Sequence, residues 1–195
     1  MPRREAAVFV LIGFAFFGAS SGAAETAAAQ PSLYQPKAAA EMPPLRVEVI
    51  DGVRFRDIQT KAIFHLFGVD ACAPGQVAML GGQSWPCGTM ATAWLVKATL
   101  GAWVACATIR DEGDEHVARC ATANHPDLAA AMLEEGDAVL APATSGEAPV
   151  AAYAAAESQA RKAFHGVWSS AFEMPWDWRA AHPDAAHAAA AEIKP

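Results

Sequence analysis

The sequence predicts an α+β fold, mainly β, in which a small closed barrel of strands carries a helical flank. Three observations predict it. Apolar residues recur at every second position over residues 45–50, a turn signal follows at Asp51-Gly52, and helical spacing begins only near residue 88. The predicted order is three strands, a helix, two strands and two helices. This pattern alone leaves other folds open.

The first three strands are predicted in residues 45–69. Leu45, Val47 and Val49 show the two-residue period of a strand with one buried face. Residues 53–58 return after the turn, and residues 61–69 are largely apolar and form the third strand. The next segment is predicted as a loop, because it is rich in glycine and proline.

The second half of the sequence predicts a β-hairpin that lies between helices along the chain. Residues 88–100 have apolar residues at helical spacing and end at Gly101. Strands at 103–109 and 116–122 flank a turn at 111–115. Asp127 caps a helix over 128–135 that stops at Gly136, and a last helix covers about 150–164.

The chain divides into four predicted segments. Residues 1–24 combine two arginines, an apolar run and a stretch of small residues, which is typical of a signal peptide. A retained membrane anchor is the alternative for this segment. Residues 25–44 are rich in alanine and proline and form a flexible linker, residues 45–180 form the domain, and residues 181–195 form a disordered alanine-rich tail.

The net charge of the chain is −7. Proteins that hold nucleic acids usually show the opposite balance, because Lys and Arg neutralise the phosphates. Arg46, Arg54, Arg56 and Lys61 form the one basic cluster near the first strands, and we expect them to lie on a solvated strand face. The acidic balance therefore disfavours nucleic acid as a partner, and an envelope protein is the alternative.

All four cysteines follow the predicted signal peptide, which favours disulfides in an oxidising compartment. Three pairings are open by arithmetic. In the predicted hairpin, the residue numbers of each facing pair sum to 226. This register places Cys106 opposite Cys120, Ile109 opposite Val117 and Arg110 opposite His116, so a Cys106–Cys120 bridge is favoured. Cys72–Cys87 follows by elimination. A metal site lacks a close pair of cysteines.

Several motifs resemble the staphylococcal-type thermonuclease family. They are VIDG at 49–52, LFGVDA at 66–71, WPCG at 85–88, VARC at 117–120, and the segment ESQARKAFHGVW at 157–168. The resemblance runs from residue 45 to about 179, and it rests on the number and order of the motifs. It implies an OB-type five-stranded barrel with about three flanking helices. It also implies phosphodiester hydrolysis with a bound Ca²⁺.

The same resemblance indicates that most of the catalytic set is substituted. Val53 stands where the family has a metal-binding aspartate, His65 where it has its first arginine, and Ala73 where it has the general-base glutamate. Glu115 takes the place of the second arginine, which reverses the charge. Only Asp70 is retained and could bind a metal, so no catalytic residue is assigned, and Ca²⁺ is expected only if residual activity persists.

The alternative hypothesis is a different site, built from the polar groups that remain at these positions and next to them. His65, Asp70, Glu115 and His116 could bind a transition metal or exchange protons. The simpler interpretation places His65 in a strand with a satisfied hydrogen bond, Asp70 in a turn and the other two at a solvated hairpin tip. Likewise, the aromatic residues at 168–178 could stack bases, but are expected to pack the C-terminal segment onto the domain.

These observations predict an exported thermonuclease-like domain that acts as a binding or structural module, in the periplasm or outside the cell. The first alternative is a weak or altered metal-dependent phosphodiesterase acting on DNA or RNA through Asp70 and His65. The second is an envelope-anchored interaction module, with residues 25–44 as its tether.

Overall fold

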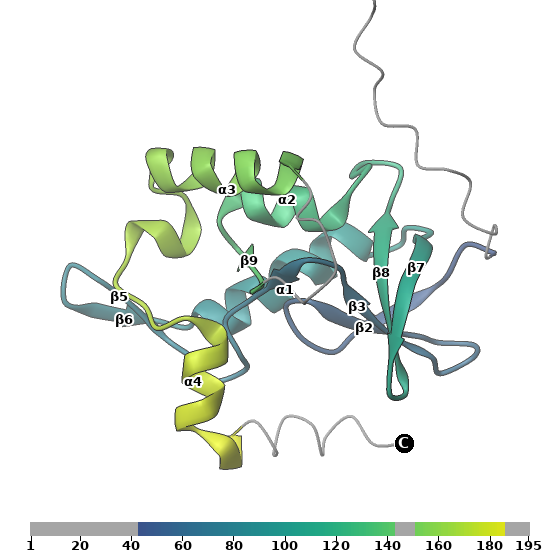
Figure 1. The fold of residues 1–195 in the computed structure, drawn as a ribbon, viewed down its shortest axis with the longest axis horizontal. Helices are drawn as coiled ribbons and strands as arrows, with labels where there is room; N and C mark the ends of the chain where they lie inside the picture. The colour runs from purple at the N-terminus through teal and green to yellow at the C-terminus, as the bar shows by residue number, and fades with distance from the viewer. Residues whose placement is uncertain (1–42, 143–150, 186–195) are drawn as a thin grey trace, which may run out of the picture. The chain divides into compact units, whose positions relative to one another are not determined.

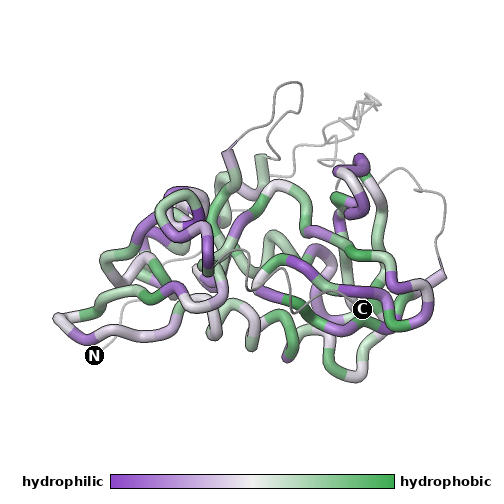
Figure 2. Tube along the Cα trace, turned by 90° about the horizontal axis from the view of Figure 1, so that it is seen from below, coloured by the Kyte–Doolittle hydropathy of each residue, from purple (hydrophilic) through white to green (hydrophobic). Residues whose placement is uncertain are grey.

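The computed structural model describes residues 43–142 and 151–185. The predicted signal peptide, nearly all of the predicted linker and residues 186–195 of the predicted tail lie outside these ranges. The described part is a mixed α+β structure with nine strands, four α-helices and one 3-10 helix (Figure 1). Hydrophobic residues are spread over the described chain rather than gathered in one segment (Figure 2).

The strands are short, and the longest two form one hairpin. They are β1 (Val47–Val49), β2 (Arg54–Asp57), β3 (Ile63–Leu66), β4 (Val69–Asp70), β5 (Ala78–Leu80), β6 (Gln83–Trp85), β7 (Ala105–Glu112), β8 (Glu115–Ala121) and β9 (Val139–Leu140). The helices are α1 (Cys87–Thr99), α2 (Leu128–Glu135), α3 (Ala151–Ala163), η1 (Gly166–Ser169) and α4 (Pro175–Ala181).

Five of the strands form one sheet in the order β1-β2-β3-β8-β7. Neighbours are antiparallel except β3 and β8, which are parallel. Beyond the two outer strands, Leu45 and Val104 form an antiparallel bridge with backbone N–H···O distances of 2.7 and 3.0 Å. The bridge links the chain just before β1 to the chain just before β7.

Alternating burial separates two faces of β2 and β3. Phe55 and Phe64 are paired across the strands, with ring centroids 5.8 Å apart, and both are buried in the core. Arg54 and His65 form the next pair in the register and point to the other, partly exposed face. This face carries the polar residues that concern the site.

The third predicted strand, 61–69, is wrong in its extent. It is divided into β3 and β4 by a turn at Phe67-Gly68, and β4 pairs with β9 instead of the main sheet. The division matters because it places Asp70 on a separate two-residue strand.

The β7–β8 hairpin has the predicted Cys106–Cys120 pair, but the predicted register beyond it is wrong. A β-bulge between Thr108 and Arg110 shifts the pairing by one, so that Arg110 lies opposite Val117 and Asp111 opposite His116. An extra residue on one strand of a pair produces this shift. The bulge leaves a two-residue connection, Gly113-Asp114, in place of the longer predicted turn.

Two disulfides join the chain, and they are the two pairs that the sequence predicts. Cys72–Cys87 has a Cα–Cα distance of 5.7 Å, and Cys106–Cys120 has one of 4.1 Å. Structural disulfides are typical of oxidising compartments. Within the described ranges, no helix has both the length and the apolar character needed to cross a membrane.

Local signals explain the helix α2. The Asp127 side chain accepts a hydrogen bond from the Ala130 N–H at the N-terminus, and Gly136 ends the helix with a left-handed φ of 74°. Helix α3 lies beside α2 (Figure 1), and its Tyr153 hydroxyl contacts both carboxylate oxygens of Asp127 at 2.9 and 2.8 Å.

The sequence-based prediction missed strand β9, which pairs with β4, and three further parts of the structure. Strands β5 and β6 form a hairpin where a loop was expected, and η1 and α4 follow the helix that was expected to be the last. Met79 of β5 bridges to Ala171, and the Trp85 indole N–H donates to the Ser170 hydroxyl at 2.9 Å. The C-terminal segment is thus attached to the hairpin before α4 begins.

Candidate ligand-binding pocket

A cavity of about 290 Å³ lies on the polar face of β2 and β3. The β1–β2 turn, β3, the start of β8, the chain after β4, and α4 all contribute to its lining. The five site positions that the thermonuclease resemblance indicates all line this cavity: Val53, His65, Asp70, Ala73 and Glu115. The structure therefore brings together positions that are far apart in the sequence.

The β1–β2 turn is fixed by Asp51. Its Oδ1 accepts hydrogen bonds from the backbone N–H groups of Val53 at 3.0 Å and Arg54 at 2.8 Å. Asparagine and aspartate commonly close turns in this way. Gly52 is required here, because an added Cβ would lie only 2.8 Å from the Ala91 Cβ in α1.

Arg54 is held between two carboxylates. Its Nε and Nη2 donate to Asp51 Oδ2 at 2.8 and 2.7 Å, and its Nη1 donates to Glu115 Oε1 at 3.1 Å. Burial opposes the charge of Arg54, but the carboxylates of Asp51 and Glu115 outweigh it and raise the pKa of Arg54. Arg54 was expected on a solvated face. Instead its side chain is 25% exposed and lines the pocket.

Asp70 is bound by an arginine from the C-terminal helix. Arg179 Nη1 donates to Asp70 Oδ1 at 3.1 Å, and Arg179 Nη2 donates to Asp70 Oδ2. Asp70 Oδ1 also accepts from the Ala71 N–H at 2.8 Å. The Asp70 side chain is 11% exposed and that of Arg179 is 39% exposed, so the carboxylate is the more buried partner.

His65 lies between these charged groups without a hydrogen bond at one ring nitrogen. Among the described residues, its buried Nε2 has no partner, so the expected satisfied hydrogen bond is wrong for this atom. Burial lowers the pKa of His65, against the opposing effect of Asp51, Glu115 and Asp70. The imidazole is therefore neutral at pH 7 and cannot replace the charge of an arginine.

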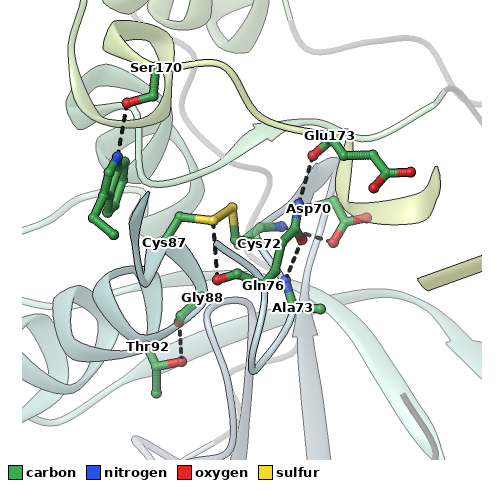
Figure 3. Close-up of a disulfide and its surroundings, with 11 residues drawn as sticks. Asp70, Cys72, Ala73, Gln76, Cys87, Gly88, Thr92, Ser170 and Glu173 are labelled. Atoms are coloured by element: carbon green, nitrogen blue, oxygen red, sulfur yellow. Dashed lines mark hydrogen bonds between the residues drawn. A yellow bond between two sulfur atoms is a disulfide. The ribbon is translucent and has the colours of Figure 1, made fainter. Parts of the chain in front are cut away.

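Val53 and Ala73 give the pocket two apolar positions, with 7% and 4% of their surfaces exposed. The Ala73 N–H donates to the Gln76 side chain at 2.9 Å, and Gln76 Nε2 donates to the Glu173 carbonyl oxygen at 2.7 Å. Figure 3 shows this bridge beside the Cys72–Cys87 disulfide. The disulfide and Gln76 together fix the chain that follows Asp70.

His116 does not belong to the pocket. Its Nδ1 lies 2.6 Å from Asp111 Oδ1 in the hairpin, and its side chain is 38% exposed. The predicted alternative site of four residues is thus wrong in including His116. Its other three members, His65, Asp70 and Glu115, do line one cavity.

The residues of the pocket do not fit the calcium ion that the thermonuclease resemblance implies. Calcium takes six to eight oxygen ligands, whereas Val53 and Ala73 offer no side-chain oxygen and both oxygens of Asp70 are bonded to Arg179. The two other carboxylates of the lining, Asp51 and Glu115, are paired with Arg54. Within residues 43–142 and 151–185, no group of three or more His, Cys, Asp or Glu residues is placed to hold a metal ion.

The C-terminal aromatic residues pack as expected. Trp168, Phe172 and Trp176 lie against a second buried cluster that includes Cys72 and Cys87. Trp178 stands apart from it and stacks on His182, with ring centroids 4.5 Å apart. This packing supports α4 and with it the position of Arg179.

Arg179 and Asp51 were not among the sequence-predicted site residues. The Asp51-Gly52 turn signal could have identified Asp51, because a turn aspartate commonly bonds the following N–H groups. Nothing local identifies Arg179, since its partner lies 109 residues earlier in the chain.

No protein-family model matches this sequence, and no curated protein matches it either.

Proposed function

We propose that this domain is a binding module of the periplasm or the extracellular space, built on an OB-type barrel of the thermonuclease kind, without the family's hydrolytic activity. The strand order and the parallel β3–β8 pair support the barrel, because they are what a five-stranded Greek-key barrel requires. The Leu45–Val104 bridge supports closure between the outer strands.

One observation carries the proposal that the domain does not hydrolyse phosphodiesters. The single retained carboxylate of the family set, Asp70, has both oxygens bonded to Arg179. Phosphodiester cleavage needs a cation held by oxygen ligands and cationic donors that face the phosphate. Here a guanidinium occupies the oxygens of Asp70, and the other arginine is held by Asp51 and Glu115.

The pocket itself supports binding. Its volume of about 290 Å³ is just below the range of small-molecule sites, about 300–1,000 Å³. Its charged side chains are fixed by ion pairs, the β1–β2 turn and a disulfide, so the cavity is pre-organised. A pre-organised site loses less entropy when a ligand binds.

A cleavage assay tests the proposal. The exported protein is incubated with single-stranded DNA and with RNA in the presence of calcium, magnesium, manganese or zinc. We expect no cleavage above the level of an Asp70→Ala variant. Metal-dependent cleavage that this substitution removes would contradict the proposal.

A weak or altered phosphodiesterase is the second candidate, and one observation favours it. His65 lines the pocket close to the charges of Arg54 and Asp70, and its Nε2 has no hydrogen-bond partner among the described residues. A neutral imidazole can accept a proton from water. If this candidate holds, His65→Ala and Asp70→Ala will each remove the activity, whereas His116→Ala, outside the pocket, will not.

The envelope-anchored alternative depends on residues 1–24, which lie outside the described ranges. The intact mass of the exported protein tests it, since a cleaved signal peptide removes these residues. A mass that includes residues 1–24 would favour the anchored module.

A further inference from the structure

The pocket already contains a ligand-like group from its own chain. Arg179 extends from α4 and presents two N–H groups to the two oxygens of Asp70. This is the bidentate geometry in which a guanidinium recognises a carboxylate. The Arg179 side chain remains 39% exposed, so solvent reaches it.

The charges of the lining favour a cation at this position. Asp51, Asp70 and Glu115 contribute three negative charges, and Arg54 contributes one positive charge. Without Arg179, the formal charge of these four groups is 1 − 3 = −2. Arg54 is held by Asp51 and Glu115, so Asp70 would lack a cationic partner. An anion such as phosphate would meet net repulsion here.

A second observation points to a ligand. His65 lines this cavity, and its buried Nε2 has no hydrogen-bond partner among the described residues. A buried polar atom without a partner typically costs about 1–3 kcal/mol. A neutral imidazole nitrogen can accept a hydrogen bond, and a guanidinium carries five N–H donors with no acceptor. A free guanidinium can satisfy an acceptor that the tethered Arg179 leaves unbonded.

We propose that the pocket recognises a guanidinium-bearing ligand, and that Arg179 is a tethered occupant which this ligand displaces from Asp70. This inference rests on the proposed binding function and names its ligand class. The guanidinium could come from a small free compound or from an arginine side chain of a partner peptide. Both present the same planar donor group to Asp70.

Competition from Arg179 determines the affinities that we expect for an external ligand. If Arg179 occupies Asp70 for most of the time, an external ligand can bind only the molecules in which the pocket is open. The apparent affinity for that ligand is then reduced in proportion to the fraction of such molecules. We therefore expect Arg179→Ala to bind methylguanidinium about tenfold more tightly than the wild-type protein does. Adding Asp70→Asn to that variant should abolish the binding.

The experiment uses the full exported chain with both disulfides intact. Calorimetry measures binding of methylguanidinium, methylammonium and inorganic phosphate, and NMR follows the His65 ring signals. Arg161→Ala is the matched control, because Arg161 pairs with Glu157 on α3 outside the pocket. It should bind like the wild type. Arg179→Gln provides a second open-pocket variant if Arg179→Ala does not fold.

The outcomes distinguish the two sources of the guanidinium, and they separate this inference from the binding-module proposal. Tighter binding of an arginine tripeptide than of methylguanidinium assigns a peptide ligand, and the reverse order assigns a small compound. Absence of saturable guanidinium binding to folded Arg179→Ala and Arg179→Gln would overturn the inference. Tighter binding of phosphate than of methylguanidinium would also overturn it. Neither result alters the binding-module proposal, which fails only through metal-dependent cleavage.

Discussion

Arg179 donates to both carboxylate oxygens of Asp70 across 109 residues of sequence, and it does so from the last described helix. The contact joins the segment after β3 to the C-terminal segment at the edge of the pocket. It also occupies both oxygens of the one carboxylate that the thermonuclease resemblance retains. Its energetic and chemical consequences can be tested separately.

Substituting one partner of this pair should destabilise the fold. Arg179→Ala leaves the nearly buried Asp70 without its counter-charge, and we expect a loss of about 1–3 kcal/mol in the free energy of unfolding. Asp70→Asn should reduce the cost of removing Arg179, because the two effects are coupled. Urea unfolding of the two single variants and the double variant measures the coupling. Additive losses would show that the pair contributes nothing.

The two disulfides provide a matched comparison. They have sequence separations of 15 and 14 residues, so the chain-entropy model predicts a similar loss of about 3 kcal/mol for each. Replacing Cys72 and Cys87 with alanine should also change the pocket, because Cys72 lines it. Replacing Cys106 and Cys120 should not. Thermal unfolding measures the loss of stability, and the NMR signals of the His65 ring report the change in the pocket.

Asp137 should make stability depend on pH. Burial, with a smaller effect of Glu135, raises the pKa of Asp137 to about 6. The folded state therefore binds more protons than the unfolded state between pH 3.8 and about 6, and stability falls as pH rises through this window. Since the carboxyl is partly exposed, we expect Asp137→Asn to stabilise the protein by about 1 kcal/mol above pH 7.

The measurement for Asp137 is the melting temperature of both proteins from pH 4 to pH 8. The difference between variant and wild type should be largest at pH 8 and vanish near pH 4. A constant difference across this range would contradict the assignment.

His65 should act in the opposite direction. Its pKa is lowered by burial, so below about pH 6.5 the unfolded state binds more protons and stability falls as pH falls. His65→Gln removes the titrating group and should flatten this part of the stability curve. His116→Gln, at the exposed hairpin, is the control. If both variants flatten the curve equally, His65 is not the group responsible.

Tyr153 should connect α3 to the start of α2. Tyr153→Phe removes the hydroxyl that contacts both oxygens of Asp127, with an expected loss of about 1 kcal/mol. Asp127→Ala should cost more, because it also removes the cap on the Ala130 N–H. Equal losses would indicate that the cap contributes little.

Local signals explain which parts of the fold were predictable. Helix α2 was predicted to the residue, because Asp127 and Gly136 mark its two ends. The β5–β6 hairpin was missed although Gly81-Gly82 separates two short strands, which is a known signal for a two-residue turn. The bulge between Thr108 and Arg110 has no glycine to indicate it, so the register beyond Cys106–Cys120 was not predictable.

The pocket was predictable only where the sequence carried a motif. The five family positions were identified by resemblance, and they do meet in one cavity. The ion pairs within it depend on the three-dimensional arrangement. Arg54 was expected on a solvated strand face with the other basic residues of its cluster, and Arg179 belongs to a helix that was not expected.

The attachments of the C-terminal segment have a consequence for limited proteolysis. Met79–Ala171, Trp85–Ser170 and Gln76–Glu173 all join the domain before α4 begins. A cut between Glu173 and Pro175 would leave these three attachments, the five-stranded sheet and both disulfides, but would release Arg179. Loss of the chain from Pro175 onward would then unmask Asp70 irreversibly, as the activation of a zymogen unmasks its site.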